Sequence, residues 1–175
     1  MTGSNKRISR APVVVVVVGL GAALGLVMLG AALAAAPAPA PVIDRPGTAA
    51  SPRPVNVIMR EYRFDPTPLY LVPGETVRLN VFNGGMIEHE LALGDAAFQA
   101  AWSAANAAAT PAGPFASPPP ASVDPGLTGL RLVLGSGGQA VVDYAVPASG
   151  MLQLICHLPT HAERGMIGEV KVATP

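Results

Sequence analysis

Three side chains that bind soft metal ions recur at equal steps near the end of this chain. Cys156, His161 and Met166 offer a thiol, an imidazole and a thioether, with four residues between each and the next. A loop of this length can bring all three to one ion at little cost in closure entropy. A thiolate and imidazoles with a weak axial thioether suit copper, and such a site needs one more imidazole. The segment that carries it must fold back onto this loop, so the site constrains the whole fold.

His89 is the histidine best able to complete the site. The chain has three histidines, and His157 directly follows Cys156, so in an extended segment its side chain points the other way. Glu88 and Glu90 flank His89, surroundings more typical of a surface histidine, so His89 is selected by elimination. The predicted copper ligands are therefore His89, Cys156, His161 and Met166.

From Val55 onward, short apolar segments rich in Val, Ile, Leu and Tyr alternate with Gly, Pro and Asn turns. This pattern predicts an all-β sandwich or barrel. In residues 76–83, for example, the alternation directs Val77, Leu79 and Val81 to one face. The predicted strands are residues 55–62, 69–72, 76–83, 89–93, 130–134, 139–145, 151–156 and 167–172.

Residues 95–128 interrupt this pattern. Ala96–Ala109 is rich in alanine, and Phe98 and Trp102 lie four residues apart, which favours a short helix with both rings on one side. Residues 111–125 consist mainly of Pro, Gly, Ser and Ala, which indicates a loop. We interpret the segment as an insertion that covers an edge or face of a sheet. The alternative is a partner-docking element near the metal.

Residues 1–36 indicate a membrane anchor. Residues 11–36 carry no charge, and a helix that rises about 1.5 Å per residue spans a bilayer core of roughly 30 Å with such a length. Lys6, Arg7 and Arg10 precede this run without an acidic residue, so the positive-inside rule keeps this end in the cytoplasm. The alternative is a cleaved signal peptide, but the apolar run is longer than usual for one.

A proline- and alanine-rich linker, residues 37–54, leads to the domain of residues 55–175. The anchor places this domain on the periplasmic or extracytoplasmic side of the membrane, and signal cleavage would instead release a secreted or periplasmic protein. Cys156 is the only cysteine, so no intrachain disulfide can form, and a lone thiol in an oxidising compartment favours a metal ligand.

Charge argues against nucleic acid as a partner. Three of the eleven basic residues precede the apolar run, which leaves eight against eleven acidic residues in the rest of the chain. The sequence therefore has no basic patch for nucleic acid. The expected partners are redox proteins and, through the anchor, the membrane, and we expect a monomer.

Several motifs together resemble the cupredoxin family of small blue copper proteins, such as plastocyanin, pseudoazurin and auracyanin. The family pattern of a Pro-Gly turn, a strand that ends in Asn-x-Gly and a His-Glu-aliphatic triplet is matched by Pro73-Gly74, Asn83-Gly84-Gly85 and His89-Glu90-Leu91. Its C-terminal Cys-x4-His-x4-Met, followed by Gly-x-Val, is matched by Cys156, His161, Met166, Gly168 and Val170. The resemblance covers about Val55 to Val172 and implies a Greek-key β-sandwich with one type 1 copper ion bound by the four predicted ligands. Thr160 departs from the pattern, because a glycine commonly precedes the loop histidine.

The function expected from these features is single-electron transfer, not enzymatic catalysis. Three histidines are too few for a multicopper oxidase or a two-domain nitrite reductase, and one cysteine is too few for a dinuclear copper centre. We expect electrons to pass through an exposed edge of His161, within an apolar shell that includes Met86, Leu158, Pro159 and Ile167. His157 is expected at the surface, or else as a second path beside the Cys156 sulfur. Two alternatives remain: a copper-delivery or copper-buffering protein of the cell envelope, and a β-sandwich interaction module with a buried thiol.

Overall fold

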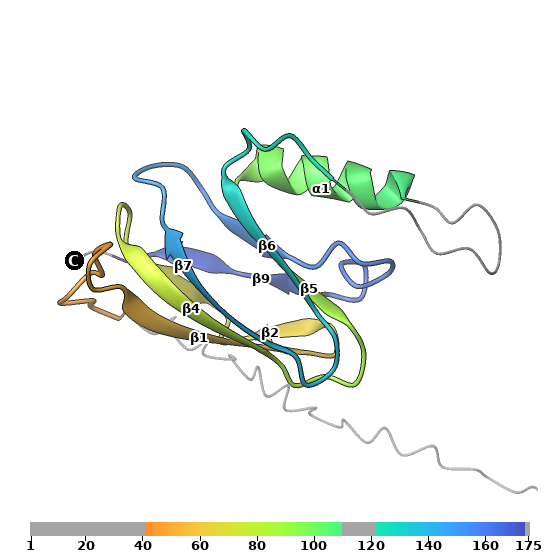
Figure 1. Ribbon diagram of the computed structural model, residues 1–175, viewed down its shortest axis with the longest axis horizontal. Helices are drawn as coiled ribbons and strands as arrows, with labels where there is room; N and C mark the ends of the chain where they lie inside the picture. Colours follow the sequence, from red (N-terminus) through yellow and green to blue (C-terminus); the bar gives the residue numbers. More distant parts are fainter. Residues whose placement is uncertain (1–40, 110–121, 174–175) are drawn as a thin grey trace, which may run out of the picture. The chain divides into compact units, whose positions relative to one another are not determined.

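The computed structural model describes residues 41–109 and 122–173. They form two four-stranded sheets, one two-stranded sheet and a single helix, α1 (Ala96–Ala108). Figure 1 shows α1 lying along one side of the strands. The predicted all-β fold with a helix in the insertion is thus confirmed. The predicted anchor lies outside the described residues. Among those residues, no helix has the length and hydropathy to cross a membrane.

The first sheet has the order β2-β1-β4-β7. β1 runs parallel to β4, and the other two pairs are antiparallel. The strands are β1 (Arg53–Arg60), β2 (Arg63–Asp65), β4 (Thr76–Asn83) and β7 (Gln139–Ala145).

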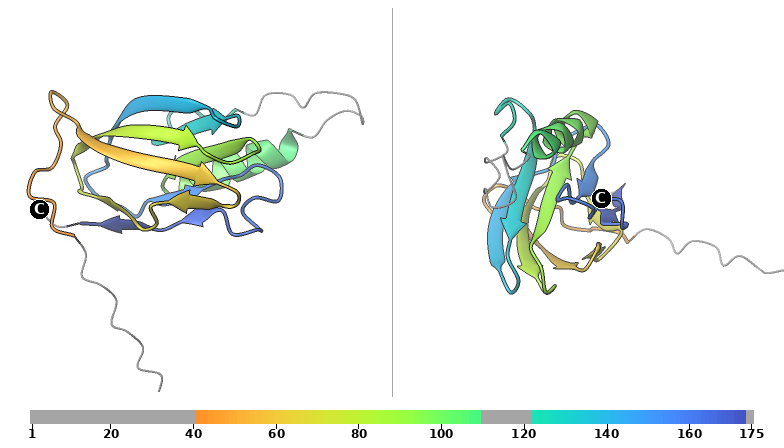
Figure 2. Two further views of the ribbon diagram at one scale, coloured as in Figure 1. Left: turned by 90° about the horizontal axis from the view of Figure 1, so that it is seen from below. Right: turned by 90° about the vertical axis from the view of Figure 1, so that its right-hand side faces the viewer.

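The second sheet has the order β6-β5-β8-β9, and all its pairs are antiparallel. A short parallel pair, β3 with β10, completes the strands. Figure 2 shows the layers from two further sides. The strands are β3 (Leu69–Leu71), β5 (His89–Gly94), β6 (Gly129–Leu134), β8 (Gln153–Ile155), β9 (Ile167–Gly168) and β10 (Val170–Val172).

The core lies between the sheets and is built by strand alternation. Val77, Leu79 and Val81 of β4 are buried, as predicted, while the residues between them face outward. Leu91 and Leu93 of β5 meet them in the same hydrophobic cluster. Burial of these apolar side chains is the main stabilising term for such a sandwich.

α1 covers the outer face of β5, so this strand is buried on both faces. Asp95 caps the helix through its Oδ1, which accepts a hydrogen bond of 2.8 Å from the Phe98 backbone N–H. Phe98 packs directly onto two strands, because a Cβ atom on either Gly94 or Gly129 would lie 2.4 Å from its ring. The helix of the insertion thus covers a sheet face, one of the two roles predicted for the segment.

Several segments differ from the predicted strands. The strand predicted over residues 55–62 runs from Arg53 to Arg60, and Glu61 and Tyr62 form the turn that follows it. The strand predicted over residues 151–156 is limited to Gln153–Ile155. β2 had no clear signal in the sequence, and the predicted strand 167–172 is two strands, β9 and β10, separated at Glu169. The separation has a physical reason, since β9 pairs with β8 in the second sheet and β10 pairs with β3. The Glu169 backbone bridges the change of sheet: its N–H donates to Thr67 Oγ1 at 2.9 Å and its carbonyl accepts from the Leu69 N–H at 2.7 Å.

Candidate metal centre

The four predicted ligands come from two neighbouring strands and the loop that follows one of them. His89 begins β5, and Cys156 follows the last residue of β8. β8 is antiparallel to β5, so the end of β8 approaches the start of β5. His161 and Met166 lie in the loop between β8 and β9. The fold therefore brings the upstream histidine to the loop, as the sequence required.

The donor atoms converge in the interior. His161 Nδ1 lies 3.3 Å from both His89 Nδ1 and Cys156 Sγ, and one ligand atom from each of these residues lies within 4.8 Å of the others. His89, Cys156 and Met166 have no exposed surface, and His161 is 7% exposed. Three strong donors are thus already assembled away from water.

Backbone hydrogen bonds close the loop that carries Met166. The Cys156 N–H donates to the Met166 carbonyl at 3.1 Å, and the Met166 N–H donates to the His161 carbonyl at 2.9 Å. Gly165 has φ of +96°, a left-handed conformation that returns the chain toward the centre. Met166 is consequently buried in the same hydrophobic cluster as Cys156.

Asn83 shapes the segment that leads into His89. Its side-chain Nδ2 donates to the Ile87 carbonyl at 2.8 Å and to the Leu134 carbonyl at 2.7 Å, while its Oδ1 accepts from the Gly85 N–H at 2.9 Å. Asn83 is fully buried, and these bonds satisfy both of its N–H donors and one of the two acceptor positions on Oδ1. The Asn-x-Gly motif thus fixes the loop from which the first imidazole enters.

Burial governs the electrostatics of the donors. It raises the pKa of the Cys156 thiol to about 11, although the Glu90 backbone N–H donates to Sγ at 3.4 Å and acts in the opposite direction. Burial also lowers the pKa of both His89 and His161, so the imidazoles are neutral near pH 7. The neighbouring Glu61 carboxylate raises the pKa of His89 and partly offsets this effect. The site therefore presents two neutral imidazoles and a thiol that must lose its proton to bind a metal.

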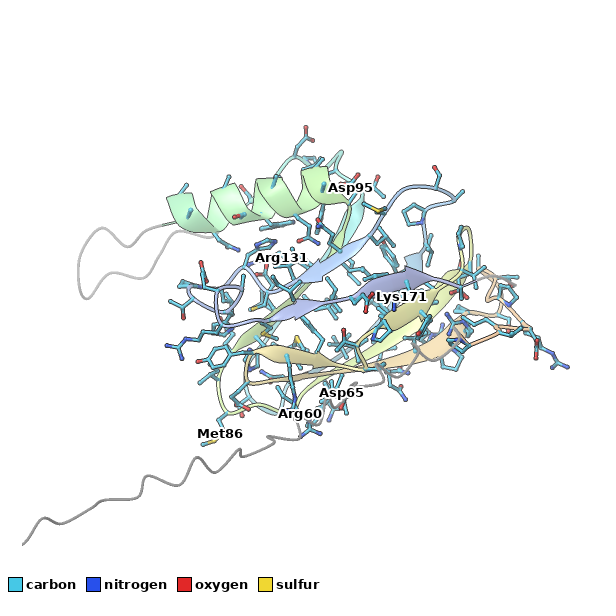
Figure 3. All side chains as sticks on the ribbon, turned by 180° about the vertical axis from the view of Figure 1, so that it is seen from behind. Arg60, Asp65, Met86, Asp95, Arg131 and Lys171 are labelled. Carbon is cyan, nitrogen blue, oxygen red and sulfur yellow. The ribbon has the colours of Figure 1, made fainter. Side chains whose placement is uncertain are left out.

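His157, expected at the surface, is half-buried, and Glu90 is fully buried. The His157 Nε2 lies 2.7 Å from Gln99 Oε1 on α1, and its backbone N–H donates to Glu90 Oε2 at 2.8 Å. Glu90 is fully buried and forms an ion pair with Arg131, whose guanidinium lies 4.1 Å from the centre of the Trp102 ring. Figure 3 shows Arg131 beneath the helix. The outer face of β5 thus ties the ligand strand to α1 through charged and polar contacts.

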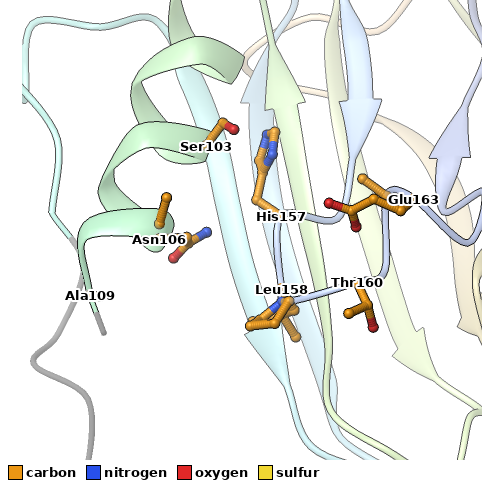
Figure 4. A pocket seen from close by; sticks show the side chains of 10 residues that line it. Ser103, Asn106, Ala109, His157, Leu158, Thr160 and Glu163 are labelled. Atoms are coloured by element: carbon orange, nitrogen blue, oxygen red, sulfur yellow. The ribbon is translucent and has the colours of Figure 1, made fainter. Parts of the chain in front are cut away.

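A pocket of about 380 Å³ lies between α1 and the ligand loop (Figure 4). Its lining includes Ser103, Asn106, His157, Leu158, Thr160 and Glu163. It lies next to the ligand loop but contains none of the four predicted ligands.

The expected apolar shell is only partly correct. Leu158 packs against the core cluster, whereas Met86 is 87% exposed and Ile167 is 57% exposed. Met86 lies at the outer edge of the molecule in Figure 3. Ile167 faces outward because its neighbours in the strand pattern, Met166 and Gly168, take the inward positions. The shell is formed instead by core residues and by Tyr62, whose ring meets His161 edge-on, with ring centres 5.3 Å apart.

The donor set fits copper of the type 1 class. One thiol, two imidazoles and a buried thioether are the donors that this class uses, and all lie in one buried cluster. His89 Nε2 is buried and has no hydrogen-bond partner among the described residues. A fully satisfied structural histidine would not leave this nitrogen unpaired.

The chain is similar to known copper proteins in both sequence and fold. It is 37% identical over 130 residues to the copper-resistant cuproprotein CopI of Rubrivivax gelatinosus, covering 73% of this chain and 72% of that protein. The CopI protein of Pseudomonas aeruginosa is 26% identical, over 73% of this chain and 81% of that one. No family model matches the chain.

Two auracyanin structures share the fold. Auracyanin B is 28% identical and superposes with a TM-score of 0.54 over 77% of this chain and 94% of its own. The dithionite-reduced auracyanin of Roseiflexus castenholzii has the same TM-score at 20% identity, over 69% of this chain and 97% of its own.

Proposed function

We propose, since this chain belongs to the cupredoxin family and to the CopI cuproproteins within it, that it binds one copper ion through His89, Cys156, His161 and Met166. The observation that carries the proposal is the buried cluster of a thiol and two imidazoles in which no donor has more than 7% of its surface exposed. Copper held by such donors exchanges a single electron between its two oxidation states. Electron transfer is accordingly the function that we propose.

The donor side chains are buried and held in place by the fold, which supports electron transfer. Donors that keep one arrangement in both oxidation states lower the barrier to transfer, and rigid surroundings hold them there. Here Cys156 is fixed at the end of β8, His89 at the start of β5, and the loop between Cys156 and Met166 is closed by its own hydrogen bonds. His161 is the only one of the four with exposed surface, so we propose that electrons leave through its imidazole to a redox protein partner.

The second candidate is copper delivery or buffering in the cell envelope. It is favoured by the relatives, which are copper-resistant cuproproteins by name. Delivery requires the metal to pass directly from these donors to those of a partner. Donors that are fully buried oppose such exchange, because the ligand loop would first have to open.

The location and partners are part of the proposal. We propose that residues 1–36 anchor a monomeric domain outside the cytoplasm, where Cys156 serves as a metal ligand and not as a disulfide partner. In this setting the domain exchanges electrons with redox proteins and catalyses no reaction of its own. Its charge balance argues against binding to nucleic acid.

Two rates measured on the copper-loaded domain distinguish the candidates. Electron exchange with a small inorganic oxidant or reductant is expected to be fast, and loss of Cu⁺ to a soluble chelator in excess is expected to be slow. An intense blue colour that disappears on reduction and returns on oxidation supports the carrier. A colourless domain that binds only Cu⁺ and gives it up readily to the chelator would favour delivery, and an absence of copper binding would leave an interaction module.

A further inference from the structure

The turn between β1 and β2 places two adjacent residues beside the two imidazole ligands. Glu61 and Tyr62 connect the end of β1 at Arg60 to the start of β2 at Arg63. Neither residue stands out in the sequence. Each nevertheless lies next to a different histidine of the candidate copper site, Tyr62 beside His161 and Glu61 near His89.

Tyr62 covers the outer side of His161. The two rings meet edge-on at 88°, with centres 5.3 Å apart. Arg164, from the ligand loop, lies over the Tyr62 ring, with its guanidinium 4.9 Å from the ring centre. His161 is only 7% exposed as a result of its surroundings, so the Tyr62 ring limits both the rotation of the imidazole and the access of water.

Glu61 approaches His89 through the space left by a glycine. A Cβ atom on Gly85 would lie 2.7 Å from His89 Nε2 and 2.9 Å from Glu61 Oε1. The imidazole nitrogen and the carboxylate oxygen therefore border the same small space, and a side chain at residue 85 would collide with both. Gly85 itself is buried, so only glycine permits this approach.

The unpaired nitrogen of His89 needs an acceptor. His89 Nδ1 faces the other donors, 3.3 Å from His161 Nδ1, so a metal bound at Nδ1 leaves the hydrogen on Nε2. Nε2 has no partner among the described residues. A metal-bound histidine usually donates its other N–H to a carboxylate, a carbonyl or water. The Glu61 side chain is exposed, and its Oε1 borders the same space as Nε2, which makes it the candidate acceptor.

Contacts on both sides hold the turn in place. Glu61 Oε1 accepts a hydrogen bond from the Met86 N–H, in the loop before His89. Tyr62 Oη accepts one of 2.9 Å from Arg164 Nη1, in the loop after His161. Tyr62 also has φ of +60°, a left-handed conformation that costs a residue other than glycine about 1 kcal/mol or more. Surrounding contacts therefore sustain a strained turn beside the site.

We propose that this turn positions both imidazoles: Glu61 accepts the Nε2 hydrogen of His89, and the Tyr62 ring fixes the plane of His161. Both are positioning residues, since neither contacts the metal. The inference rests on the proposed copper site and extends it to a segment of the chain that supplies no ligand.

Variants at Glu61 test the first half. Glu61→Ala removes the acceptor and is expected to weaken copper binding by about 10- to 100-fold, the usual cost of losing such a partner. Glu61→Gln keeps an acceptor oxygen and should retain most of the affinity. Glu88→Ala is the matched control, because it removes an exposed carboxylate next to His89 that forms no ion pair or hydrogen bond within the described part of the chain.

Variants at Tyr62 test the second half. In the reduced, diamagnetic protein, Tyr62→Leu is expected to speed exchange of the His161 ring N–H with water by about tenfold or more, because it uncovers the imidazole. Tyr62→Phe keeps the ring and should exchange only slightly faster than the wild type. Tyr70→Leu, a half-buried tyrosine in β3, serves as the control for the loss of an aromatic side chain.

The metal-free protein provides a readout that does not depend on copper. Nitrogen-15 NMR of the imidazoles is expected to show His89 with its hydrogen on Nε2, and Glu61→Ala should change this signal while Glu88→Ala does not. Circular dichroism confirms that each variant is folded. If the wild type turns blue but the Glu61 and Tyr62 variants match it in affinity, exchange and NMR signals, the inference is wrong and the proposed function stands. If the wild type binds no copper, the proposed function fails, and the metal-free spectra alone decide whether the turn positions the histidines.

Discussion

A buried polar cluster lies near each end of β4. The two clusters differ in how many of their polar atoms have hydrogen-bond partners. At the start of the strand, the buried Glu75 carboxylate accepts from Arg53 Nε at 2.8 Å and from the N–H groups of Gly47 at 3.2 Å and Val72 at 2.8 Å. Beyond the other end, three metal donors face one another and His89 Nε2 has no partner in the described structure. Paired buried groups stabilise the fold. At the other end, the donor atoms that face one another are arranged to bind a metal, and the unpaired Nε2 is left for the proposed contact with Glu61.

The Glu75 cluster also explains where the domain begins. β1 starts at Arg53, before Val55, where we expected the domain to begin, and Gly47 is joined to Glu75 and Thr76 through hydrogen bonds. A Cβ atom on Gly47 would lie 2.0 Å from the Thr76 carbonyl oxygen. Part of the proline-rich segment is therefore held against the domain by the Glu75 carboxylate and by a backbone hydrogen bond to Thr76.

The largest effect is expected at the metal end. Cys156→Ala removes the thiolate, so the blue colour of the copper-loaded protein should be lost completely, as measured by visible absorption. The metal-free variant should remain folded and lose only about 1 kcal/mol in the free energy of unfolding, because one small buried atom is removed. A variant that stays blue would contradict the ligand assignment, and a variant that unfolds would show that this end supports the fold as well.

At the Glu75 end of β4 we expect the reverse: a substitution lowers stability and leaves copper binding unchanged. Glu75→Ala leaves Arg53 and two backbone N–H groups without their acceptor, so the free energy of unfolding should fall by about 3 kcal/mol. Copper affinity of the folded protein should not change. Chemical denaturation and a copper titration measure the two quantities. Asp143→Ala, which breaks the exposed ion pair with Arg78, is the control and should change stability little. Equal losses of stability in Glu75→Ala and Asp143→Ala would contradict the stabilising role assigned to the Glu75 cluster.

Copper uptake should depend on pH through the buried thiol. The pKa of Cys156 is raised to about 11, so below that pH the metal-free protein carries a proton that the metal must displace. The imidazoles are already neutral at pH 7, because burial lowers their pKa. Each copper ion should therefore release about one proton, and affinity should rise about tenfold per pH unit between pH 7 and 9. Calorimetry in buffers of different ionisation enthalpy measures this release, and a value near zero would argue against the thiolate.

The smallest effect is expected at Thr160, which has φ of +68°. A β-branched residue is strained in this conformation, and glycine is not. Thr160→Gly should raise the free energy of unfolding by about 1 kcal/mol, the strain released less the added freedom of the unfolded chain. Thr160→Ala keeps a Cβ atom and should gain less. Thermal denaturation of the metal-free proteins checks this, and a destabilised glycine variant would show that Thr160 makes a contribution that offsets its strain.

The sequence predicted the parts of the molecule that follow local rules. Thr76–Asn83 and Gln139–Ala145 were predicted at both boundaries, because alternation and turn residues mark their ends. The convergence of His89 with Cys156 and His161 followed from the chemistry of the donor set. These features depend on residue type and spacing, which the sequence displays directly.

Other features depend on tertiary contacts and could not be predicted. Glu90 has the sequence surroundings of an exposed residue, yet it is buried because α1 covers the outer face of β5. Met86 is apolar but exposed at the edge of a loop. The approach of Tyr62 to His161 joins residues from distant parts of the chain. Such pairings follow from the packing of the sheets, which no local pattern encodes.

The central claim is that copper enters a buried site formed in advance by His89, Cys156, His161 and Met166. X-ray absorption at the copper edge, recorded on the loaded wild-type protein in both oxidation states, tests it most directly. We predict one strongly bound sulfur, two imidazole nitrogens and nearly the same coordination before and after reduction. A spectrum dominated by oxygen ligands, a missing sulfur, or a large change of coordination on reduction would contradict the account.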